Sequence, residues 1–424
     1  MTTYLILLAV MIVCFVLLVL VAKLPASLSL FITAVVVALV GGVGFPLDKF
    51  VEGMFGYLDT CLALITAMVF IKIIEANGML ARLTRGVISA FGRSPMLLLI
   101  ALTIIIMFPG MITGSSTASV LGTGALVAPI LIEMGMPLPV AGAVVASSAV
   151  YGMLAPPVNV SVMVIGGGID LPYVGFDSIL AVMSFPLAIL SSIFIGYKYI
   201  NKEKLAKIVL DAKSQKNEVN WTVYIPLIVV VLLMVGPKAF PKWFPDLMLP
   251  LTFVIGCVLG MFTGKRFNIL KTVQAGVSDI LSVVGILFGV GALIEIMTMT
   301  GLRGGIVVGA LSIPHALMLA SIAIIMPLFG GISVFGASSV LGVPFALALL
   351  GKNQIVVLSA LSLIGGMGSY MPPVALTPVV TGQLIGEPKY QNINKHLIWP
   401  AVAADAVGIL MIIFANPIAK FLGV

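Results

Sequence analysis

Two clusters of glycine and hydroxyl side chains interrupt long apolar stretches, and their residue types are suited to binding ions and polar ligands. The first cluster, GMITGSSTAS, lies at the centre of residues 96–135, and the second, FGGISVFGASS, lies within residues 314–351. Oxygens of an interrupted helix bind Na⁺, and the N-termini of half-helices attract anions. The alternative is that these small residues only let helices pack closely. The candidate binding residues are Gly114, Ser115, Ser116, Thr117, Gly336, Ser338 and Ser339.

A proline pair breaks the apolar segment that follows each cluster. Pro156–Pro157 and Pro372–Pro373 lie inside helix-forming runs, where proline removes a backbone donor and clashes with the preceding turn. We therefore expect unwound turns with available carbonyl groups at both places. Asn159 and Ser161 follow the first pair and Thr377 follows the second, so these side chains are further candidates. A kink satisfied by neighbouring hydroxyl groups is the alternative.

Three acidic residues fall within or near the ends of apolar spans: Glu75, Glu295 and Asp405. An ionisable side chain at membrane depth is costly and indicates function. Glu295 and Asp405 are candidates for proton coupling. Each acid fits a water-filled edge equally well, and Glu75, near the end of its span, fits that position better.

Metal, disulfide and enzyme chemistry lack a matching pattern. Cys14, Cys61 and Cys257 are scattered through apolar runs, and His315 and His396 are far apart. The sequence contains no HExxH, no nucleophile elbow and no phosphate-binding glycine loop. An intramembrane enzyme would need a nucleophile–base pair or a metal set, so we expect no enzyme activity and no cofactor.

The composition places the chain in a membrane. Of its 424 residues, 61% are hydrophobic and 9% are charged, whereas soluble chains carry about 25% charged residues. Soluble enzymes and nucleic-acid-binding proteins are therefore excluded. The net charge of +7 arises from lysines and arginines between apolar runs, which is typical of residues that orient a membrane protein.

The elements that position these residues are membrane-spanning helices of about 20 apolar residues each. The 40-residue regions 96–135 and 314–351 are expected to be re-entrant hairpins, and each is followed by a proline-broken crossing. Uninterrupted spans are expected at Tyr4–Ala22, Ser27–Phe45, Tyr57–Ala76, Ile179–Ile200, Thr222–Gly236, Leu247–Gly264, Asp279–Met299 and Leu397–Ala415.

An internal repeat organises these elements. Three short matches occur in the same order in both halves, at offsets of 220, 216 and 223 residues: VLG at 120–122 and 340–342, PPV at 156–158 and 372–374, and IIEANGML at 73–80 with IMTMTGLR at 296–303. We expect a first repeat at 1–200, a lysine-rich cytoplasmic connector at 201–221 and a second repeat at 222–424.

The charges predict how the repeats are oriented. Each repeat has five crossings and one hairpin, and an odd number of crossings inverts the second repeat relative to the first. With the N-terminus outside, 16 of the 22 lysines and arginines lie inside and 6 lie outside, as the positive-inside rule expects. The fold class is thus an all-α integral membrane protein with two inverted repeats.

The chain resembles the large membrane subunit of TRAP transporters, the DctM-like group within the ion transporter superfamily. The resemblance is carried by GSSTASVLGTGALVAPILIEMGMP from Gly114, APPV at 155–158 and MPPVALTPVVTGQLIG from Met371. It implies an elevator-type transporter with two opposed hairpins and Na⁺-coupled uptake of organic acids. It also implies two partners, a small membrane subunit and a periplasmic substrate-binding protein.

We therefore expect a multi-pass inner-membrane transporter that imports a small organic anion, such as a C4-dicarboxylate or sugar acid, with Na⁺ held at the hairpin tips and unwound helices. The alternative is a stand-alone H⁺- or Na⁺-coupled organic-anion carrier of the same superfamily, without a binding protein. A channel is a further class, but paired interrupted hairpins suit alternating access better than an open pore.

Overall fold

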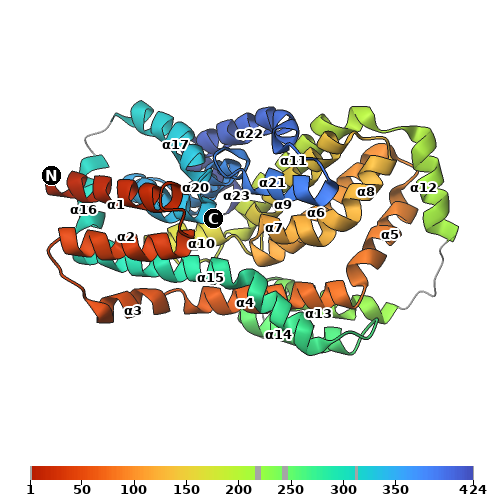
Figure 1. Cartoon of the computed structure of the whole chain (residues 1–424), viewed down its shortest axis with the longest axis horizontal. Coiled ribbons are helices and arrows are strands. Elements are labelled where there is room, and N and C mark those ends of the chain that lie inside the picture. Colours follow the sequence, from red (N-terminus) through yellow and green to blue (C-terminus); the bar gives the residue numbers. More distant parts are fainter. Residues whose placement is uncertain (1, 215–220, 241–246, 311–313, 424) are drawn as a thin grey trace.

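The computed structural model describes residues 2–214, 221–240, 247–310 and 314–423, and every regular element in these ranges is helical. The helices form an elongated bundle in which the two halves of the chain interleave (Figure 1). Helix α2 packs along α15, and α9 packs against α21 and α22.

The first half of the chain contains eleven α-helices and a π-helical turn, η1. Their bounds are α1 Thr2–Leu20, α2 Ala26–Val40, α3 Leu47–Phe55, α4 Leu58–Ala76, α5 Met79–Phe91, α6 Pro95–Thr113, α7 Ser116–Ser119, η1 Val120–Gly124, α8 Ala125–Glu133, α9 Leu138–Leu154, α10 Val160–Gly167 and α11 Asp177–Gly196, followed by the 3₁₀ turn η2 Tyr197–Tyr199.

The second half begins after helix α12 (Lys202–Ser214) and contains a second π-helical turn, η4. Its elements are η3 Trp221–Tyr224, α13 Ile225–Ala239, α14 Leu249–Met261, α15 Ile269–Met299, α16 Leu302–Ala310, α17 His315–Gly330, α18 Val334–Ala337, η4 Ser338–Gly342, α19 Val343–Ala348, α20 Gln354–Met367, η5 Gly368–Tyr370, α21 Leu376–Ile385, α22 Tyr390–Ile413 and α23 Ala415–Leu422.

The described helices are those of a multi-span membrane protein. Six are long and apolar enough to cross a bilayer, or seven if α3 and α4, bent by 48° at a short break, form one span. The expected spans correspond to α1, α2, α4, α11, α13, α14, α15 and α22. Helix α15 begins at Ile269, ten residues before the start expected at Asp279, and thus carries Asp279 in its interior.

The two hairpins have the same order of local elements. In each, a long helix ends, a short break follows, and the chain returns through one short α-helix, one π turn and a second α-helix. We call the returning segments, residues 116–133 and 334–348, the return arms. The first hairpin spans α6–α8 and the second spans α17–α19, close to the expected 96–135 and 314–351.

A glycine with a left-handed backbone precedes the linking helix in each half. Gly78 (φ 85°) ends α4 before α5, and Gly301 (φ 71°) ends α15 before α16. These two glycines are 223 residues apart, the offset of the match between 73–80 and 296–303. Glycine adopts this conformation without the steric cost that a side chain brings. A left-handed glycine therefore allows the turn into the linking helix in both halves of the chain.

The helices form two bodies that also share apolar contacts. The hairpin body, residues 95–196 and 315–422, has one buried cluster that includes side chains of α6, α9, α11, α17, α20 and α22. The frame, residues 2–76 and 225–299, is built around α2, α4 and α15, and its main apolar cluster continues into the hairpin body through Val164, Phe329 and Val343. Helices α5 and α16 connect the frame to the two hairpins.

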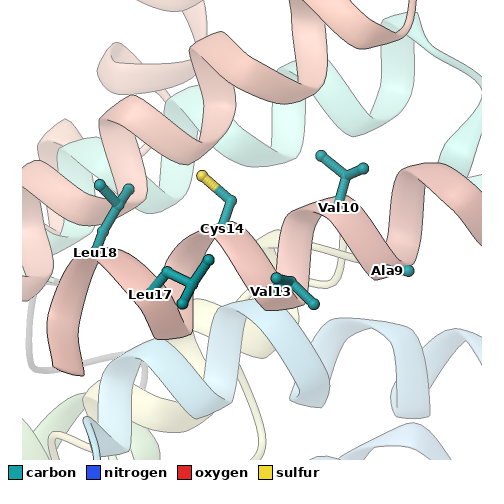
Figure 2. Close-up of a pocket in the computed structure, with 6 residues that line it drawn as sticks. All are labelled: Ala9, Val10, Val13, Cys14, Leu17 and Leu18. Carbon is teal, nitrogen blue, oxygen red and sulfur yellow. The ribbon is translucent and has the colours of Figure 1, made fainter. Parts of the chain in front are cut away.

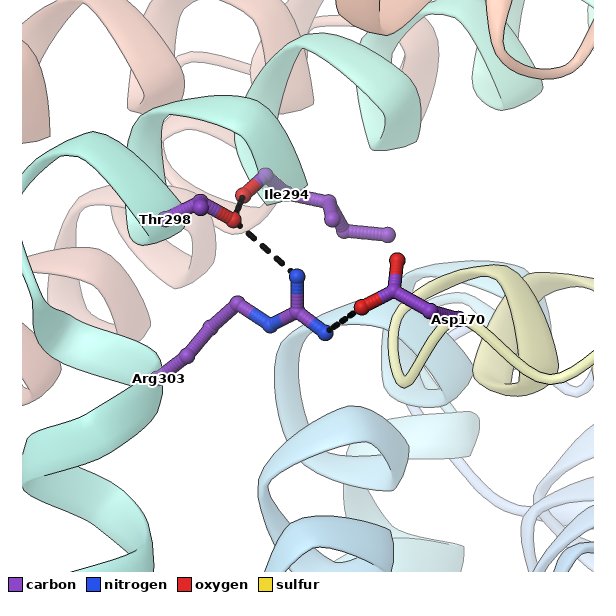
Figure 3. Close-up of polar contacts among 4 residues, drawn as sticks. All are labelled: Asp170, Ile294, Thr298 and Arg303. Carbon is purple, nitrogen blue, oxygen red and sulfur yellow. Dashed lines mark hydrogen bonds and ion pairs between the residues drawn. The ribbon is translucent and has the colours of Figure 1, made fainter.

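Polar contacts between the bodies gather at the C-terminal end of α10. The Tyr57 hydroxyl donates to the Val164 carbonyl oxygen at 2.9 Å. Beyond α10, the Asp170 carboxylate pairs with the Arg303 guanidinium at 2.7 Å, and Arg303 also donates to Thr298 on α15 (Figure 3). This ion pair joins the hairpin body to the first turn of α16.

The lysine-rich connector contains a docked helix. Helix α12 packs on α5 and α8, and its Leu205 and Val209 side chains are buried. The polar face of α12 remains exposed, so the expected solvated connector describes only part of this segment. Residues 215–220 of the connector lie outside the described ranges.

Candidate functional site

A cavity of about 330 Å³ lies where both hairpins meet the frame. Small-molecule pockets commonly have volumes of about 300 to 1,000 Å³, so this cavity fits a small solute. Its lining comes from the first return arm, the second hairpin break, the segments on either side of Pro372–Pro373, and helix α15. The polar and glycine residues of the lining are Ser115, Ser116, Thr117, Gly330, Gly331, Ser333, Gly368, Ser369, Asp279 and Ser282.

The first hairpin break is built by local hydrogen bonds. Helix α6 ends at Gly114, whose φ of 63° turns the chain. Ser115 then caps the return arm, since its Oγ accepts from the Ala118 amide at 3.3 Å. The amide of Ser115 in turn donates to the Thr113 hydroxyl at 3.3 Å. Of the predicted residues in this cluster, Ser115, Ser116 and Thr117 line the cavity.

The second break lies earlier in the sequence than predicted. Helix α17 ends at Gly330, and Ser333 caps the return arm by accepting from the Gly336 amide at 3.1 Å. Gly336, Ser338 and Ser339, predicted at this tip, lie within the return arm and are buried outside the cavity lining. The Ser338 hydroxyl donates to the Val334 carbonyl oxygen at 3.0 Å.

The reason for this displacement is the register of the repeat. The capping serines Ser115 and Ser333 are 218 residues apart, as are the starts of the two π turns. The VLG match at an offset of 220 is therefore two residues out of structural register. The preference of serine for the start of a helix was the available signal for Ser333, but it applies equally to Ser338 and Ser339 until the helix boundary is known.

The cavity joins residues that are far apart in the sequence. Ser116 Oγ and Thr377 Oγ1 lie 3.0 Å apart, across 261 positions of the chain. Both side chains are buried. The predicted candidates from the first hairpin and from the second proline-broken segment therefore meet at one place.

Both proline segments are unwound and attached to their hairpins. Pro156–Pro157 separates α9 from α10, and Pro372–Pro373 separates η5 from α21; both peptide bonds are cis. The Val158 amide donates to the Met111 carbonyl oxygen at 3.1 Å, and the Val374 amide donates to that of Gly331 at 3.4 Å. The expected helix breaks at both proline pairs are observed, and none of the four prolines lines the cavity.

The Asn159 side chain forms hydrogen bonds with backbone groups on both sides of the first proline break. Its Oδ1 accepts from the Val162 amide at 3.0 Å, and its Nδ2 donates to the Leu154 carbonyl oxygen and to Ser362 Oγ. The side chain is fully buried. Its donors and acceptor are thus engaged in capping α10 and linking it to α9 and α20.

Helix termini contribute partial positive charge to the cavity. The first turns of both return arms and of α21 face it, through Ser116, Thr117, Val334, Phe335 and Leu376. The first amides of a helix lack intrahelical partners, and the helix dipole is positive at that end. Among the described lining residues the single charged side chain is Asp279, which the sequence analysis had assigned to a span end.

The three acids within or near the apolar spans, including the proton-coupling candidates Glu295 and Asp405, lie outside the lining. Glu75 is exposed, with its carboxylate 3.8 Å from Lys72 Nζ. Glu295 lies on the face of α15 that packs against α3 near Gly53. Asp405 is on α22, and its Oδ1 is buried with no hydrogen-bond partner among the described residues.

A second, larger hollow of about 490 Å³ is not a site for a polar ligand. It lies along α1 and is lined by Ala9, Val10, Val13, Cys14, Leu17 and Leu18 (Figure 2). Apart from the Cys14 thiol, these side chains are hydrocarbon. Such a surface suits acyl chains or apolar helices and offers no groups to bind a carboxylate or Na⁺.

Comparison with solved structures and with protein families places this fold. The crystal structure of the Alcanivorax borkumensis YdaH transporter, described as having an unusual topology, matches with a TM-score of 0.60 and 14% identity, covering 88% of each chain. No curated protein matches the sequence. Residues 6–418 match the family described as "Tripartite ATP-independent periplasmic transporter, DctM component". The chain therefore belongs to this DctM family, whose members are non-enzymatic, multi-pass permeases of the cytoplasmic membrane that carry out secondary transport of organic anions.

Proposed function

We propose that the chain imports a small organic anion, such as a C4-dicarboxylate or a sugar acid, together with Na⁺, and that both bind in the cavity between the hairpins. The observation that carries this proposal is the convergence of both interrupted hairpins and the start of α21 on one cavity of about 330 Å³. Irregular backbone at membrane depth is tolerated where it lines such a polar cavity.

The described lining of the cavity contains no lysine or arginine, yet other groups in it suit an anion. Three helix N-termini supply partial positive charge, and the hydroxyl groups of Ser116, Thr117 and Ser369 supply donors. Amides at helix N-termini are known to bind carboxylates and phosphates. These groups are therefore the expected carboxylate ligands.

The same segments suit Na⁺. The described residues contain no group of three or more His, Cys, Asp or Glu side chains that would hold a transition metal. Neutral oxygens are instead abundant at the two breaks, where Ser115 and Ser333 stand beside unwound backbone. Unwound carbonyls and helix ends coordinate Na⁺ in other transporters with interrupted helices. A bound Na⁺ would also offset part of the charge of the anion.

We further propose that the two halves are inverted repeats and that the hairpin body moves as a unit against the frame. Support comes from the shared order of break, return arm and π turn, and from the paired glycines Gly78 and Gly301. Each hairpin is connected to the frame by one linking helix, α5 or α16. Movement about these helices would expose the cavity alternately to the two sides of the membrane.

The proposed partners are a small membrane subunit and a periplasmic substrate-binding protein, as the tripartite family description implies. A binding protein would deliver the anion to the outer face. A membrane subunit would hold the frame while the hairpin body moves.

Uptake into proteoliposomes tests this function. The purified chain, alone and together with any small membrane subunit and binding protein encoded beside it, is assayed with labelled succinate and gluconate under an imposed Na⁺ gradient. We expect uptake that requires the Na⁺ gradient. Uptake that ignores Na⁺ but follows a pH gradient would support the stand-alone H⁺-coupled carrier, and steady single-channel currents would contradict secondary transport altogether.

A further inference from the structure

The charge of Asp279 poses a problem for an anion-binding cavity. Its side chain is about half exposed and is the single charged group among the described lining residues. A carboxylate beside the site repels an incoming carboxylate, and a cavity with low-dielectric walls strengthens that repulsion. An anion carrier therefore needs a neighbouring cation that offsets this charge.

Lys72 stands in the position to do so. It lies on α4, and its Nζ is 2.9 Å from Asp279 Oδ2 on α15. Glu75, one turn further along α4, lies 3.8 Å from the same Nζ. The Lys72 side chain is 26% exposed, so this contact is shielded from bulk water more than an ordinary surface ion pair.

The other described ion pairs have no such relation to the site. Lys49 and Glu52 pair at 2.6 Å along one face of α3, and Arg303 and Asp170 pair beyond α10. None of these four residues lines the cavity. Of these ion pairs, Lys72–Asp279 is thus the one with a member in the lining of the proposed substrate cavity.

We propose that Lys72 is a positioning residue for anion transport: by pairing with Asp279 it offsets the charge of the one ionised side chain in the described cavity lining, and so allows a carboxylate substrate to bind there. The inference rests on the proposed function. It states that the balance between the charges of Lys72 and Asp279 determines how well the cavity binds an anion. Lys72 acts through Asp279 and not as a direct ligand of the substrate.

The test is a charge-balance series measured as the KM for uptake of succinate or gluconate, whichever the wild-type chain transports. Lys72→Met leaves Asp279 unpaired, so we expect KM to rise roughly tenfold or more, with a smaller change in the maximal rate. Asp279→Asn removes the repelling charge itself, so this variant alone should lower the KM for the anion. The double variant Lys72→Met/Asp279→Asn should recover a near-wild-type KM.

Two further readouts separate charge balance from a structural role. The raised KM of Lys72→Met should fall as ionic strength increases, because salt screens the unpaired carboxylate. The exchanged pair Lys72→Asp/Asp279→Lys keeps opposite charges at the two positions and should transport with a lower KM than Lys72→Met, which keeps the test informative if Lys72→Met folds poorly. Lys49→Met, which breaks an ion pair away from the cavity, is the matched control and should leave KM unchanged.

Two results would overturn the inference. One is loss of uptake in Asp279→Asn, which would make Asp279 a direct ligand of the coupling ion. The other is a double variant or an exchanged pair that remains as impaired as Lys72→Met. Absence of any organic-anion uptake by the wild-type chain contradicts the proposed function instead, so the two failures are distinguishable.

Discussion

Ser116 and Thr377 come from opposite halves of the chain and contact each other through their hydroxyl groups at 3.0 Å. Ser116 lines the cavity, whereas Thr377 is buried directly behind it in the first turn of α21. Their sequence neighbourhoods, a serine-rich break and a proline pair, predicted both as candidates. Their contact follows from the packing of two distant helices, which no local pattern encodes.

Ser116→Leu should abolish uptake while the protein still folds and inserts, because the larger side chain fills the cavity and displaces Thr377. The milder changes Ser116→Ala and Thr377→Val should each raise KM by about three- to tenfold, the equivalent of one hydrogen bond of about 1 kcal/mol. The measurement is initial uptake rate, with size-exclusion profiles to verify folding. Ser321→Leu on α17, where the hydroxyl donates to the Leu317 carbonyl oxygen of its own helix, is the control. Wild-type uptake by Ser116→Leu would remove the first hairpin from the site.

Other residues of the site could not be predicted for reasons that the structure makes plain. Asp279 was placed at a span end because a charge within an apolar run usually marks its boundary, yet α15 continues for ten residues before it. Ser333 escaped notice because the second cluster contains several serines, and only the helix boundary identifies which one caps the return arm. Asparagine side chains can bind ions and polar substrates, but the Asn159 side-chain oxygen accepts from the Val162 amide and caps α10.

At the scale of elements, the first hairpin is held to its return arm by side chains. Helix α6 contains Pro109, and the Gly110 amide donates to Ser119 Oγ at 2.7 Å. The Thr123 hydroxyl donates back to the Ile106 carbonyl oxygen at 3.3 Å. Two hydroxyl groups of the return arm thus satisfy backbone groups of α6, which fixes the break relative to the rest of the hairpin.

The crossing of α6 with α9 depends on two glycines. A Cβ added at Gly152 would lie 2.5 Å from the Met107 carbonyl oxygen, and one added at Gly110 would lie 2.9 Å from the backbone of Gly152. Gly152→Ala should therefore force the helices apart and destabilise the protein by about 1–3 kcal/mol. Thermal unfolding in detergent measures this change.

The control for that substitution is Gly86→Ala. Gly86 is an exposed residue of α5 with open space where a Cβ would stand. Alanine favours a helix over glycine by about 0.5–1 kcal/mol, so this variant should be slightly more stable than wild type. Equal melting temperatures for the two variants would contradict the close approach of α6 and α9.

The lengths of the apolar runs and the positions of the glycines and prolines that interrupt them were sufficient to predict most of the helices. Both hairpins and both broken crossings were predicted close to their observed bounds. Helix α3 was missed because Asp48, Lys49 and Glu52 interrupt its apolar pattern within nine residues. The docking of α12 was missed because its lysines dominate the composition, although Leu205 and Val209 share one face.

At the scale of the whole molecule, the Asp170–Arg303 ion pair reports whether the hairpin body moves. It links this body to α16 in the conformation described (Figure 3). As an exposed pair it contributes little to stability, at most about 1 kcal/mol. A covalent link at the same place would fix the hairpin body to the linking helix α16 far more firmly.

Cross-linking Asp170→Cys/Arg303→Cys, in a background with Cys14, Cys61 and Cys257 replaced, should therefore stop uptake, and reduction should restore it. Labelled succinate or gluconate uptake before and after reduction is the measurement. Lys49→Cys/Glu52→Cys, a pair within α3 alone, should cross-link without effect. Undiminished uptake by a fully cross-linked Asp170→Cys/Arg303→Cys protein would contradict rigid-body movement at this interface.

The π turns in the two return arms have a consequence for how these hairpins tolerate changes in length. A π turn holds one residue more than an α turn, so η1 and η4 each contain a surplus residue a few positions after the break. Deleting one residue there would let the helix close into regular α geometry, and the capped tip would keep its orientation relative to the rest of the arm, because the wider turn had already accommodated the extra residue. A one-residue deletion elsewhere in the arm would instead rotate the tip by about 100°. The two hairpins should therefore tolerate a deletion at the π turn better than one at any other position of the return arm.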